Sequence, residues 1–584
     1  MKCRSLRFLL FLLGAVALGA PSLRAAEAPR LNLLLITADD LNADSPGWMG
    51  SKMGATPTLD QLAASGHRFV NHHVIVPICQ PSREALMTGR LPHHSGALGF
   101  NPIKPGTPTL VTTLQTAGYY TVGINKLAHM KPASCFPWEE AIVSGSGKNP
   151  PLLRRQFATA LKNAAHANKP FFINLNITDP HRPFPGATAG DAEATAEAAA
   201  PARNREDSAT QPGRPQVMTA EEEANQFRQM RYYKPEEVKV PDFLEDLPQV
   251  RVEIAQYFTA VARMDLSLKG VLEALHDSGH EKDTIIVFLG DNGMSFPFSK
   301  ATVYVDGTWE PVILKYPGMP AAAAHEEFVS SVDIMPTLLD LLGVNPPEGI
   351  DGRSWLPLLH GQKQEARDYV ITHVNTVFGG GDYPQRCIRT KDWALIFHAW
   401  PDGTAKFRVE AMSGLTYPAL VTAAKSDARI AERVQQYRVG EPRMFFNERA
   451  DATERVNLIH DPRSRSEIER LAKILLRELE KTHDPQTANF QKSLSEWQAK
   501  PAIEPAGHAR KAAADSFERP PALPGQDSDP ISPHLPEQAF GGSRTPSIWR
   551  GETKSPGATP APAATAGHAG TEDLARSSKG FRPR

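Results

Sequence analysis

Residues 79–90 read Cys-Gln-Pro-Ser-Arg-Glu-Ala-Leu-Met-Thr-Gly-Arg, and the organisation of the rest of the chain follows from this stretch. Pro81 suits the first turn of a helix, where its missing N–H is not needed. The residues that follow are helix formers, and Gly89 is a typical helix end. The stretch therefore predicts a loop that delivers Cys79 to the positive end of a short helix, with Arg83 one turn further along. This environment suits an anionic substrate and a reactive side chain, although a lone Cys beside a helix end is more often structural.

Length and composition restrict the class of protein. The 584 residues suffice for one large domain and a smaller one. With 64 basic and 65 acidic side chains the net charge is −1, so no global field favours nucleic acid or a membrane surface as a partner. Four cysteines are too few for a disulfide scaffold. Cys135 and Cys387 could pair, and their spacing leaves the question open.

The first residues have the pattern of a secretory signal peptide. Lys2, Arg4 and Arg7 precede an apolar run over residues 8–20, and small residues follow it. The run is too short for a stable membrane span, and no later segment is long and apolar enough for one. We therefore expect residues 1–26 to be a signal peptide and the mature protein to be exported, either periplasmic or secreted. An uncleaved membrane anchor is the alternative.

Polar side chains follow predicted strands at the point where each strand ends. The apolar run 31–37 is typical of a buried parallel strand, and Asp39 and Asp40 come just after it. In open, mostly parallel sheets, ligand sites gather at the carboxyl ends of the strands, so we expect these groups at one edge. Paired carboxylates of this kind suit Ca²⁺ or Mg²⁺. Three later strands end in the same way: 119–124 before Lys126 and His129, 171–177 before His181, and 284–289 before Asp291 and Asn292.

The pattern of elements changes near residue 368. Up to that point strand and helix patterns alternate, which predicts an α/β catalytic domain over residues 27–367. Beyond it come shorter strands, at 369–373 and 393–398, and then a helix near 466–482. We expect residues 368–500 to form a smaller C-terminal subdomain.

Two segments have the composition of unstructured chain. Residues 186–215 are rich in Ala, Gly, Thr, Glu and Pro, which is typical of a flexible surface insertion. Residues 501–584 are rich in Pro, Ala, Gly and Ser, with few large apolar side chains. Such a segment cannot bury enough surface to offset its ordering entropy, so it predicts a disordered tail.

The stretch around Cys79 resembles the signature of the type I sulfatases, in the alkaline phosphatase superfamily. In that family the Cys is oxidised to formylglycine by a maturation enzyme, the aldehyde hydrates, one hydroxyl attacks sulfur, and the other later expels sulfate. The resemblance implies an alkaline-phosphatase-like fold: a large mixed, mostly parallel sheet flanked by helices, and an antiparallel sheet with a helix in the C-terminal subdomain. The signature residues present here are Cys79, Pro81, Ser82, Arg83, Thr88, Gly89 and Arg90.

The resemblance also implies a role for each candidate residue. Residue 79, as the hydrated aldehyde, is the nucleophile, and Arg83 holds it. His129 helps to deprotonate the hydrate, although Lys126 and His129 stand one residue further apart than in most of the family, as in the iduronate sulfatases. Lys126 and Lys300 bind sulfate oxygens, and His181 assists the leaving group. One divalent cation is expected, Ca²⁺ with Mg²⁺ as the alternative, held by Asp39, Asp40, residue 79, Asp291 and Asn292.

Two passages resemble the sulfamidase branch of the family, which removes N-linked sulfate from heparan. One covers residues 291–311 and the other is Thr482-His-Asp-Pro485, but Lys300 stands where that branch has Arg. The expected substrate is a sulfated carbohydrate, N-sulfated or O-sulfated. Two alternatives stay open: a phosphate-ester or phosphonate hydrolase of the same superfamily, and an inactive glycan-binding relative.

Overall fold

The computed structural model describes residues 30–143, 145–187 and 230–499. The predicted signal peptide, nearly all of the predicted insertion and the predicted tail lie outside the described residues. Within the described part, no helix has both the length and the apolar character that crossing a membrane requires.

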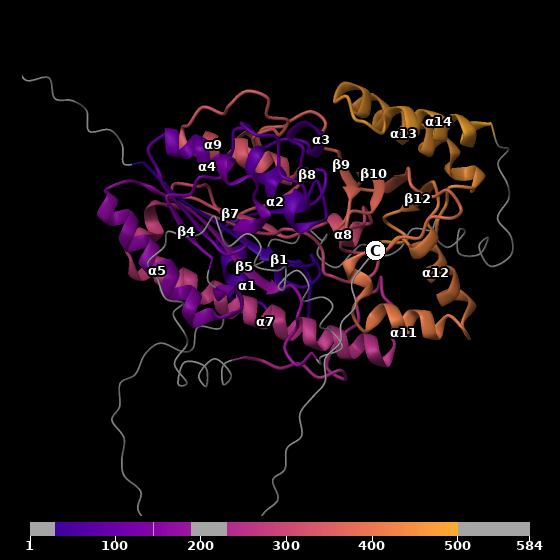
Figure 1. Cartoon of the computed structure of the whole chain (residues 1–584), viewed down its shortest axis with the longest axis horizontal. Coiled ribbons are helices and arrows are strands. Elements are labelled where there is room, and N and C mark those ends of the chain that lie inside the picture. Colours follow the sequence, from indigo (N-terminus) through magenta and orange to yellow (C-terminus); the bar gives the residue numbers. More distant parts are fainter. Residues whose placement is uncertain (1–29, 144, 188–229, 500–584) are drawn as a thin grey trace, which may run out of the picture. The chain divides into compact units, whose positions relative to one another are not determined.

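The larger sheet has eight strands in the order β4-β3-β5-β1-β6-β7-β2-β8 (Figure 1). Neighbouring strands are parallel except where β7 pairs with β6 and with β2. The prediction of a mixed, mostly parallel sheet is confirmed. The strands are β1 (Asn32–Asp39), β2 (His67–His73), β3 (Tyr120–Ile124), β4 (Glu140–Ile142), β5 (Phe171–Pro180), β6 (Thr284–Gly290), β7 (Val312–Lys315) and β8 (Ala324–Ser330).

Successive side chains of β1 point to opposite faces of the sheet, and each face is covered by its own helices. Leu34 and Ile36 belong to the core that includes α5 (Pro150–Ala167) and α7 (Pro248–Asp277). Leu33 and Leu35 belong to the opposite core. Burial on both faces explains why the strand reads as a continuous apolar run. The opposite core includes α2 (Cys79–Thr88), α4 (Leu110–Thr116), α9 (Ile334–Leu342) and α10 (Leu356–Leu359).

Three short helices complete this part of the fold. They are α1 (Pro57–Ala64), α3 (Pro92–Ser95) and α8 (Val305–Thr308).

The smaller sheet has four antiparallel strands in the order β12-β11-β10-β9. Leu395 and Phe397 of β11 pack against Leu471 and Leu475 of α13. The predicted antiparallel sheet with a helix is therefore confirmed, while three further helices had no clear signal in the sequence. The elements are β9 (Tyr369–Thr376), β10 (Asp382–Thr390), β11 (Trp393–His398), α11 (Thr416–Ala423), α12 (Ala428–Val439), β12 (Arg443–Asn447), α13 (Arg465–Lys481) and α14 (Thr487–Gln498).

Cys135 and Cys387 do not form a disulfide with one another. Cys135 and Cys387 are both buried free thiols. Cys387 lies in β10 of the smaller sheet, whereas Cys135 lies in the larger-sheet part of the chain. The pairing that the sequence left open is therefore excluded.

Candidate active site

The carboxyl ends of β1 and β6 bring three aspartates together. β1 lies beside β6 in the sheet, and Asp39 is its last residue. Asp40 follows with a φ of 64°, a left-handed conformation that Asp tolerates better than most residues. Its N–H donates to Asp291 Oδ1 at 3.1 Å. The structure thus places these carboxylates at one edge, as the strand pattern predicted.

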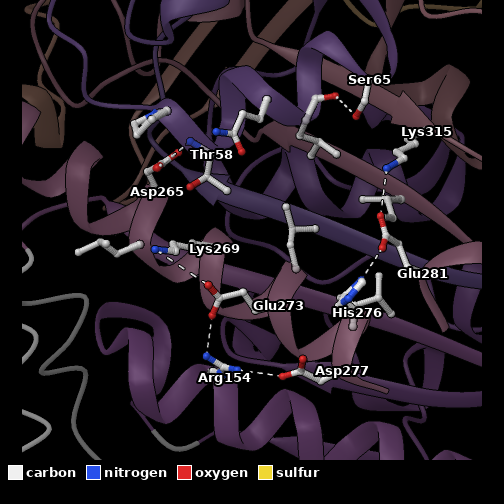
Figure 2. Close-up of a pocket in the computed structure, with 17 residues that line it drawn as sticks. Thr58, Ser65, Arg154, Asp265, Lys269, Glu273, His276, Asp277, Glu281 and Lys315 are labelled. Carbon is white, nitrogen blue, oxygen red and sulfur yellow. Dashed lines mark hydrogen bonds and ion pairs between the residues drawn. The ribbon is translucent and has the colours of Figure 1, made fainter. Parts of the chain in front are cut away.

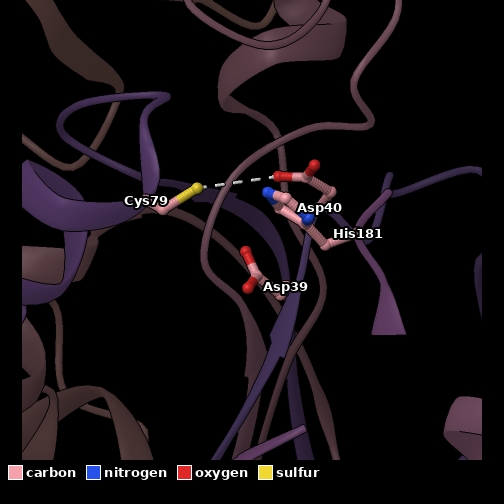
Figure 3. Close-up of side chains that lie close together, drawn as sticks. All are labelled: Asp39, Asp40, Cys79 and His181. Atoms are coloured by element: carbon pink, nitrogen blue, oxygen red, sulfur yellow. Dashed lines mark hydrogen bonds between the residues drawn. The ribbon is translucent and has the colours of Figure 1, made fainter. Parts of the chain in front are cut away.

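Cys79 lies directly against this edge. It is the first residue of α2, and Gly89 ends that helix with a φ of 62°. The Cys79 thiol lies 3.8 Å from Asp40 Oδ1 (Figure 3). One ligand atom from each of Asp39, Asp40, Cys79 and His181 lies within 4.8 Å of the others. The residues come from β1, α2 and the end of β5, so the fold assembles this group from distant parts of the sequence.

Arg83 lies one turn along α2 and contacts the carboxylates. Its guanidinium is 2.7 Å from Asp291 Oδ2 and 3.8 Å from Asp39 Oδ2. It also donates to Thr37 Oγ1 at 2.7 Å and to the side-chain oxygen of Asn176. Arg83 is therefore a fixed, buried counter-charge for the aspartates. Thr37 and Asn176 lie within β1 and β5, and the sequence had not singled them out.

Two lysines meet the same carboxylates. Lys126 Nζ lies 2.7 Å from Asp39 Oδ2, and the left-handed backbone of Lys126, with a φ of 51°, aims it there. Lys300 Nζ lies 3.0 Å from Asp40 Oδ1. Asn292 donates to the same Asp40 oxygen at 2.7 Å. Both predicted sulfate-binding lysines thus contact the carboxylates that lie beside the thiol.

His181 points at a glutamate that the sequence did not reveal. His181 Nδ1 lies 2.6 Å from the carbonyl oxygen of Arg182, and because a carbonyl can only accept, Nδ1 carries the hydrogen. His181 Nε2 lies 3.6 Å from Glu410 Oε1. The other oxygen of Glu410 lies 3.3 Å from Lys300 Nζ. Glu410 follows β11, so the C-terminal subdomain contributes a side chain to the site.

A buried carboxylate on α7 holds the Glu410 segment in place. Glu253 accepts hydrogen bonds from the backbone N–H of Leu415 at 2.9 Å and of Thr416 at 2.7 Å. The Arg182 guanidinium lies 2.5 Å from the same carboxylate. Arg182 is the neighbour of His181, so one carboxylate fixes both the histidine loop and the segment that carries Glu410.

His129 is not part of the group of potential metal-ligating side chains around Cys79. Its buried ring meets Phe100 edge to face, with ring centroids 5.9 Å apart. Among the described residues, the group around Cys79 consists of Asp39, Asp40 and His181 and does not include His129. Its role in deprotonating the nucleophile therefore stays a prediction.

Burial and neighbouring charges shift the pKa values of Asp39 and Cys79 in opposite directions. Burial alone would raise the pKa of Asp39, but Lys126, His181 and Arg83 hold it well below its usual range. Burial raises the pKa of the Cys79 thiol well above its usual value, and Asp39 and Asp40 add to this effect while Lys300 opposes it. For an unmodified Cys79, burial thus favours the protonated thiol, which is a poorer nucleophile than a thiolate.

Comparison with known proteins decides the family. Residues 31–344 match the family described as "Sulfatase". This chain belongs to the sulfatase family. In addition, residues 293–404 match the family described as "N-sulphoglucosamine sulphohydrolase, C-terminal". The sulfatase prediction is thus confirmed, and the chain is a sulfuric ester hydrolase by family. Membership also implies a divalent metal and a formylglycine.

Individual relatives agree with this assignment. Human N-sulphoglucosamine sulphohydrolase is 28% identical to this sulfatase over 499 residues, which cover 78% of this chain and 91% of the human protein. A solved structure in complex with its substrate D-glucosamine-2-N,6-O-disulfate has a TM-score of 0.56 and 19% identity, covering 79% of this chain and 99% of its own. A phosphonate monoester hydrolase from Silicibacter pomeroyi has a TM-score of 0.52 and 20% identity, covering 78% and 96%. The fold alone does not separate sulfatases from phosphonate hydrolases, but the family match does.

The donor atoms of this sulfatase fit the metal that the family implies. Both Asp39 carboxylate oxygens and Asn292 Oδ1 are buried, and they accept no hydrogen bond from the described residues. A buried acceptor without a donor is energetically unfavourable. The ion pair with Lys126 compensates only one of these three oxygens, Asp39 Oδ2. A hard divalent cation binds carboxylate and amide oxygens of this kind. Asp39, Asp40, Asp291 and Asn292 would hold it and would face residue 79.

A separate pocket of this sulfatase lies away from the candidate active site and lacks side chains suited to an anionic substrate. It measures about 660 Å³ and lies beside the start of β6 (Figure 2). None of the predicted site residues is among the described residues that line it. Its charged side chains pair with one another and leave no cationic group for an anionic substrate. These pairs join Arg154 to Glu273 and Asp277, Lys269 to Glu273, and His276 and Lys315 to Glu281.

Proposed function

We propose that this sulfatase removes sulfate from a sulfated carbohydrate, as a sulfate ester or a sulfamate, with residue 79 as the nucleophile. The observation that carries the proposal is that Lys126 and Lys300 contact Asp39 and Asp40, the two carboxylates that lie with His181 in the group around Cys79. Fixed cationic groups around one reacting atom stabilise the charge that develops on sulfate oxygens in the transition state. The two lysines would bind these oxygens, and His181 Nε2 would give a proton to the leaving oxygen or nitrogen.

The nucleophile is proposed to be formylglycine rather than the thiol. Burial and the neighbouring carboxylates keep the Cys79 thiol protonated, so the unmodified side chain is a poor nucleophile and a poor metal ligand. Oxidation to an aldehyde by a formylglycine-generating enzyme would supply a hydrate with two hydroxyl groups, one to attack sulfur and one to expel sulfate. Arg83 would then hold the carboxylates that face this hydrate.

The proposed cation is Ca²⁺, with Mg²⁺ as the alternative. Asp39, Asp40 and Asp291 supply carboxylate oxygens, and Asn292 supplies an amide oxygen. Such an ion would act as a Lewis acid on the sulfate oxygens. The signal-peptide pattern of residues 1–26 supports export, to the periplasm or the medium, which suits a polysaccharide substrate.

A sulfated glucosamine is the proposed substrate. The human relative is by name an N-sulphoglucosamine sulphohydrolase, and the ligand in one similar structure is D-glucosamine-2-N,6-O-disulfate. The match of residues 293–404 to the C-terminal part of the sulphohydrolase family covers Lys300, which lies at the sulfate-binding edge. The linkage of the sulfate, through nitrogen or oxygen, is the feature that the experiment below decides.

A substrate panel tests this function. We expect the exported enzyme, loaded with Ca²⁺, to release sulfate from N-sulfated or 6-O-sulfated glucosamine at least about 100-fold faster than it releases phosphate from the matching phosphate ester. The measurements are ion chromatography of the released anion and mass analysis of the peptide that contains residue 79, where an aldehyde is expected. Faster release of phosphate would replace the sulfatase assignment with that of a phosphate-ester hydrolase.

Glu410→Gln tests the glutamate that the C-terminal subdomain contributes. Removing its negative charge favours neutral His181, so the pKa of His181 should fall and the alkaline limb of the kcat profile should move to lower pH. We expect kcat at pH 7 to fall about 10- to 100-fold. KM should not rise, because the change removes an anion from an anion-binding pocket. A raised KM with an unmoved pH profile would show that Glu410 binds the sugar instead.

The exposed Glu432 on α12 provides the matched control for this substitution. Glu432→Gln makes the same chemical change in the same subdomain, away from His181. It should leave both kcat and the pH profile unchanged.

A further inference from the structure

A second group of metal-ligating side chains lies apart from the candidate active site. His93, His373 and Asp484 each place one donor atom within 4.8 Å of the other two. His93 belongs to α3, which follows the signature helix, whereas His373 lies on β9 and Asp484 follows α13. The imidazole rings of His93 and His373 stack with centroids 5.9 Å apart and an interplanar angle of 9°. The cluster therefore joins the catalytic part of the chain to the C-terminal subdomain.

The distances within the cluster do not fit hydrogen bonding. Asp484 Oδ2 lies 3.7 Å from His93 Nδ1 and 3.6 Å from His373 Nδ1. Hydrogen bonds between nitrogen and oxygen rarely exceed about 3.2 Å. Both Nδ1 atoms are buried and have no hydrogen-bond partner in the described part of the chain. Metal–ligand bonds of 2.0–2.2 Å at a tetrahedral centre separate two ligands by about 3.4 Å, close to the spacing found here.

The hydrogen bond that His93 makes through Nε2 leaves Nδ1 with a free lone pair. His93 Nε2 lies 2.9 Å from the carbonyl oxygen of Thr482, which can only accept a hydrogen bond. In a neutral ring Nε2 therefore carries the hydrogen, and the Nδ1 lone pair faces the Asp484 carboxylate. Burial lowers the pKa of His93 and also that of His373, so neutral rings are favoured. The His93 Nδ1 lone pair and the carboxylate repel one another unless a cation lies between them, and a carbonyl behind a ligating His is a common second-layer contact in metal sites.

Arg386 holds the carboxylate in position. Its guanidinium donates to Asp484 Oδ2 at 2.8 Å and to Asp484 Oδ1 at 3.0 Å. This contact fixes the orientation of the carboxylate toward the two imidazoles. It also adds a positive charge beside the cluster, which lowers the affinity for a cation. We therefore expect a dissociation constant on the order of micromolar, well above that of structural zinc sites.

We propose that His93 Nδ1, His373 Nδ1 and Asp484 Oδ2 bind a transition-metal ion, with a fourth coordination position left for water. The combination of nitrogen and oxygen donors favours Zn²⁺. Two imidazoles and one carboxylate are ligands that Zn²⁺ accepts and that Ca²⁺, which prefers oxygen, does not. The bound ion would tie α3 to β9 and to the turn that follows α13. It would thus stabilise the contact between the two parts of the chain without taking part in sulfate transfer.

The test uses the full chain in a large excess of Ca²⁺, so that oxygen-rich sites are filled. Zn²⁺ is titrated in by calorimetry, and the melting temperature is recorded with and without it. We expect one equivalent to bind with a dissociation constant on the order of micromolar, and the melting temperature to rise. His93→Gln should weaken binding at least about tenfold and remove most of the rise.

His94→Gln is the matched control. His94 Nε2 contacts the same Thr482 carbonyl at 2.8 Å, and His94 Nδ1 lies 2.8 Å from Asp351, outside the cluster. This variant should bind Zn²⁺ as the wild type does. The proposal would be overturned if His93→Gln bound Zn²⁺ as tightly as the wild type, or if the wild type bound none. The Asp484–Arg386 ion pair would then be the only functional interaction in the cluster.

Cobalt provides a second measurement that does not depend on a variant. Co²⁺ in a four-coordinate site with nitrogen and oxygen ligands absorbs visible light far more strongly than octahedral Co²⁺ does. We expect this strong absorption in wild-type protein in excess Ca²⁺, and its loss on addition of one equivalent of Zn²⁺. A weak, octahedral spectrum would contradict the proposed site.

Discussion

Cys79→Ala should lower kcat for sulfate release by at least about 10⁴-fold while the protein stays folded. The substitution removes the side chain on which the aldehyde would form, and the group around it contains no other thiol among the described residues. The side chain is small and 0% exposed, so its loss leaves only a minor cavity, and the cost to stability should stay near 1 kcal/mol, about the size of one lost heavy group. Initial rates with the best substrate of the panel, together with circular dichroism, check both parts of the expectation.

Two controls test whether the loss of activity is specific to residue 79. Cys135→Ala removes another buried free thiol outside the site and should leave kcat unchanged. Wild-type protein made in a host without a maturation enzyme should resemble Cys79→Ala, because its residue 79 remains a protonated thiol. Full activity of either Cys79→Ala or the unmodified wild type would exclude a formylglycine nucleophile at this position.

Asp39→Asn should lower kcat by about 10³-fold and weaken Ca²⁺ binding. The substitution removes a buried carboxylate and leaves Lys126, at 2.7 Å, without its counter-charge. A buried charge that loses its partner is costly, so we also expect a loss of stability of about 3 kcal/mol unless the lysine shifts. The measurements are kcat as a function of added Ca²⁺, metal content after dialysis, and the melting temperature.

Asp44→Asn is the matched control for this second substitution. Asp44 follows the same strand, but burial raises its pKa, so a neutral Asn is a mild change there. Its amide partner Asn42 donates to it at 2.8 Å and can still do so after the change. Chelator-treated wild type should regain activity with Ca²⁺, whereas Asp39→Asn should not at the same concentration. Full activity of Asp39→Asn without metal would show that this edge of the sheet binds no catalytic cation.

The sequence revealed those parts of the site that depend on strand ends. Asp39, Asp40 and Asp291 were predictable because a buried parallel strand reads as an apolar run and its carboxyl end is where polar residues meet. The sequence gives no order of strands, so the contact between β1 and β6, which brings these residues together, came only from the fold.

Other parts of the site had no local signal. Glu410 follows a short strand of the smaller sheet, and only the packing of that sheet brings it to His181. The raised pKa of the Cys79 thiol also has no local signal, because burial depends on the whole fold. The stacking of His93 with His373 also has no local signal, because it depends on a contact between α3 and β9, which are far apart in the sequence.

The complete burial of Cys79 has a consequence for biosynthesis. The ribosome makes Cys79 well before Asp291, Lys300 and Glu410, which later enclose it. A maturation enzyme would therefore have to reach the thiol before these later segments fold over it. Slower docking of the late segments should then increase the fraction of molecules that carry formylglycine at residue 79.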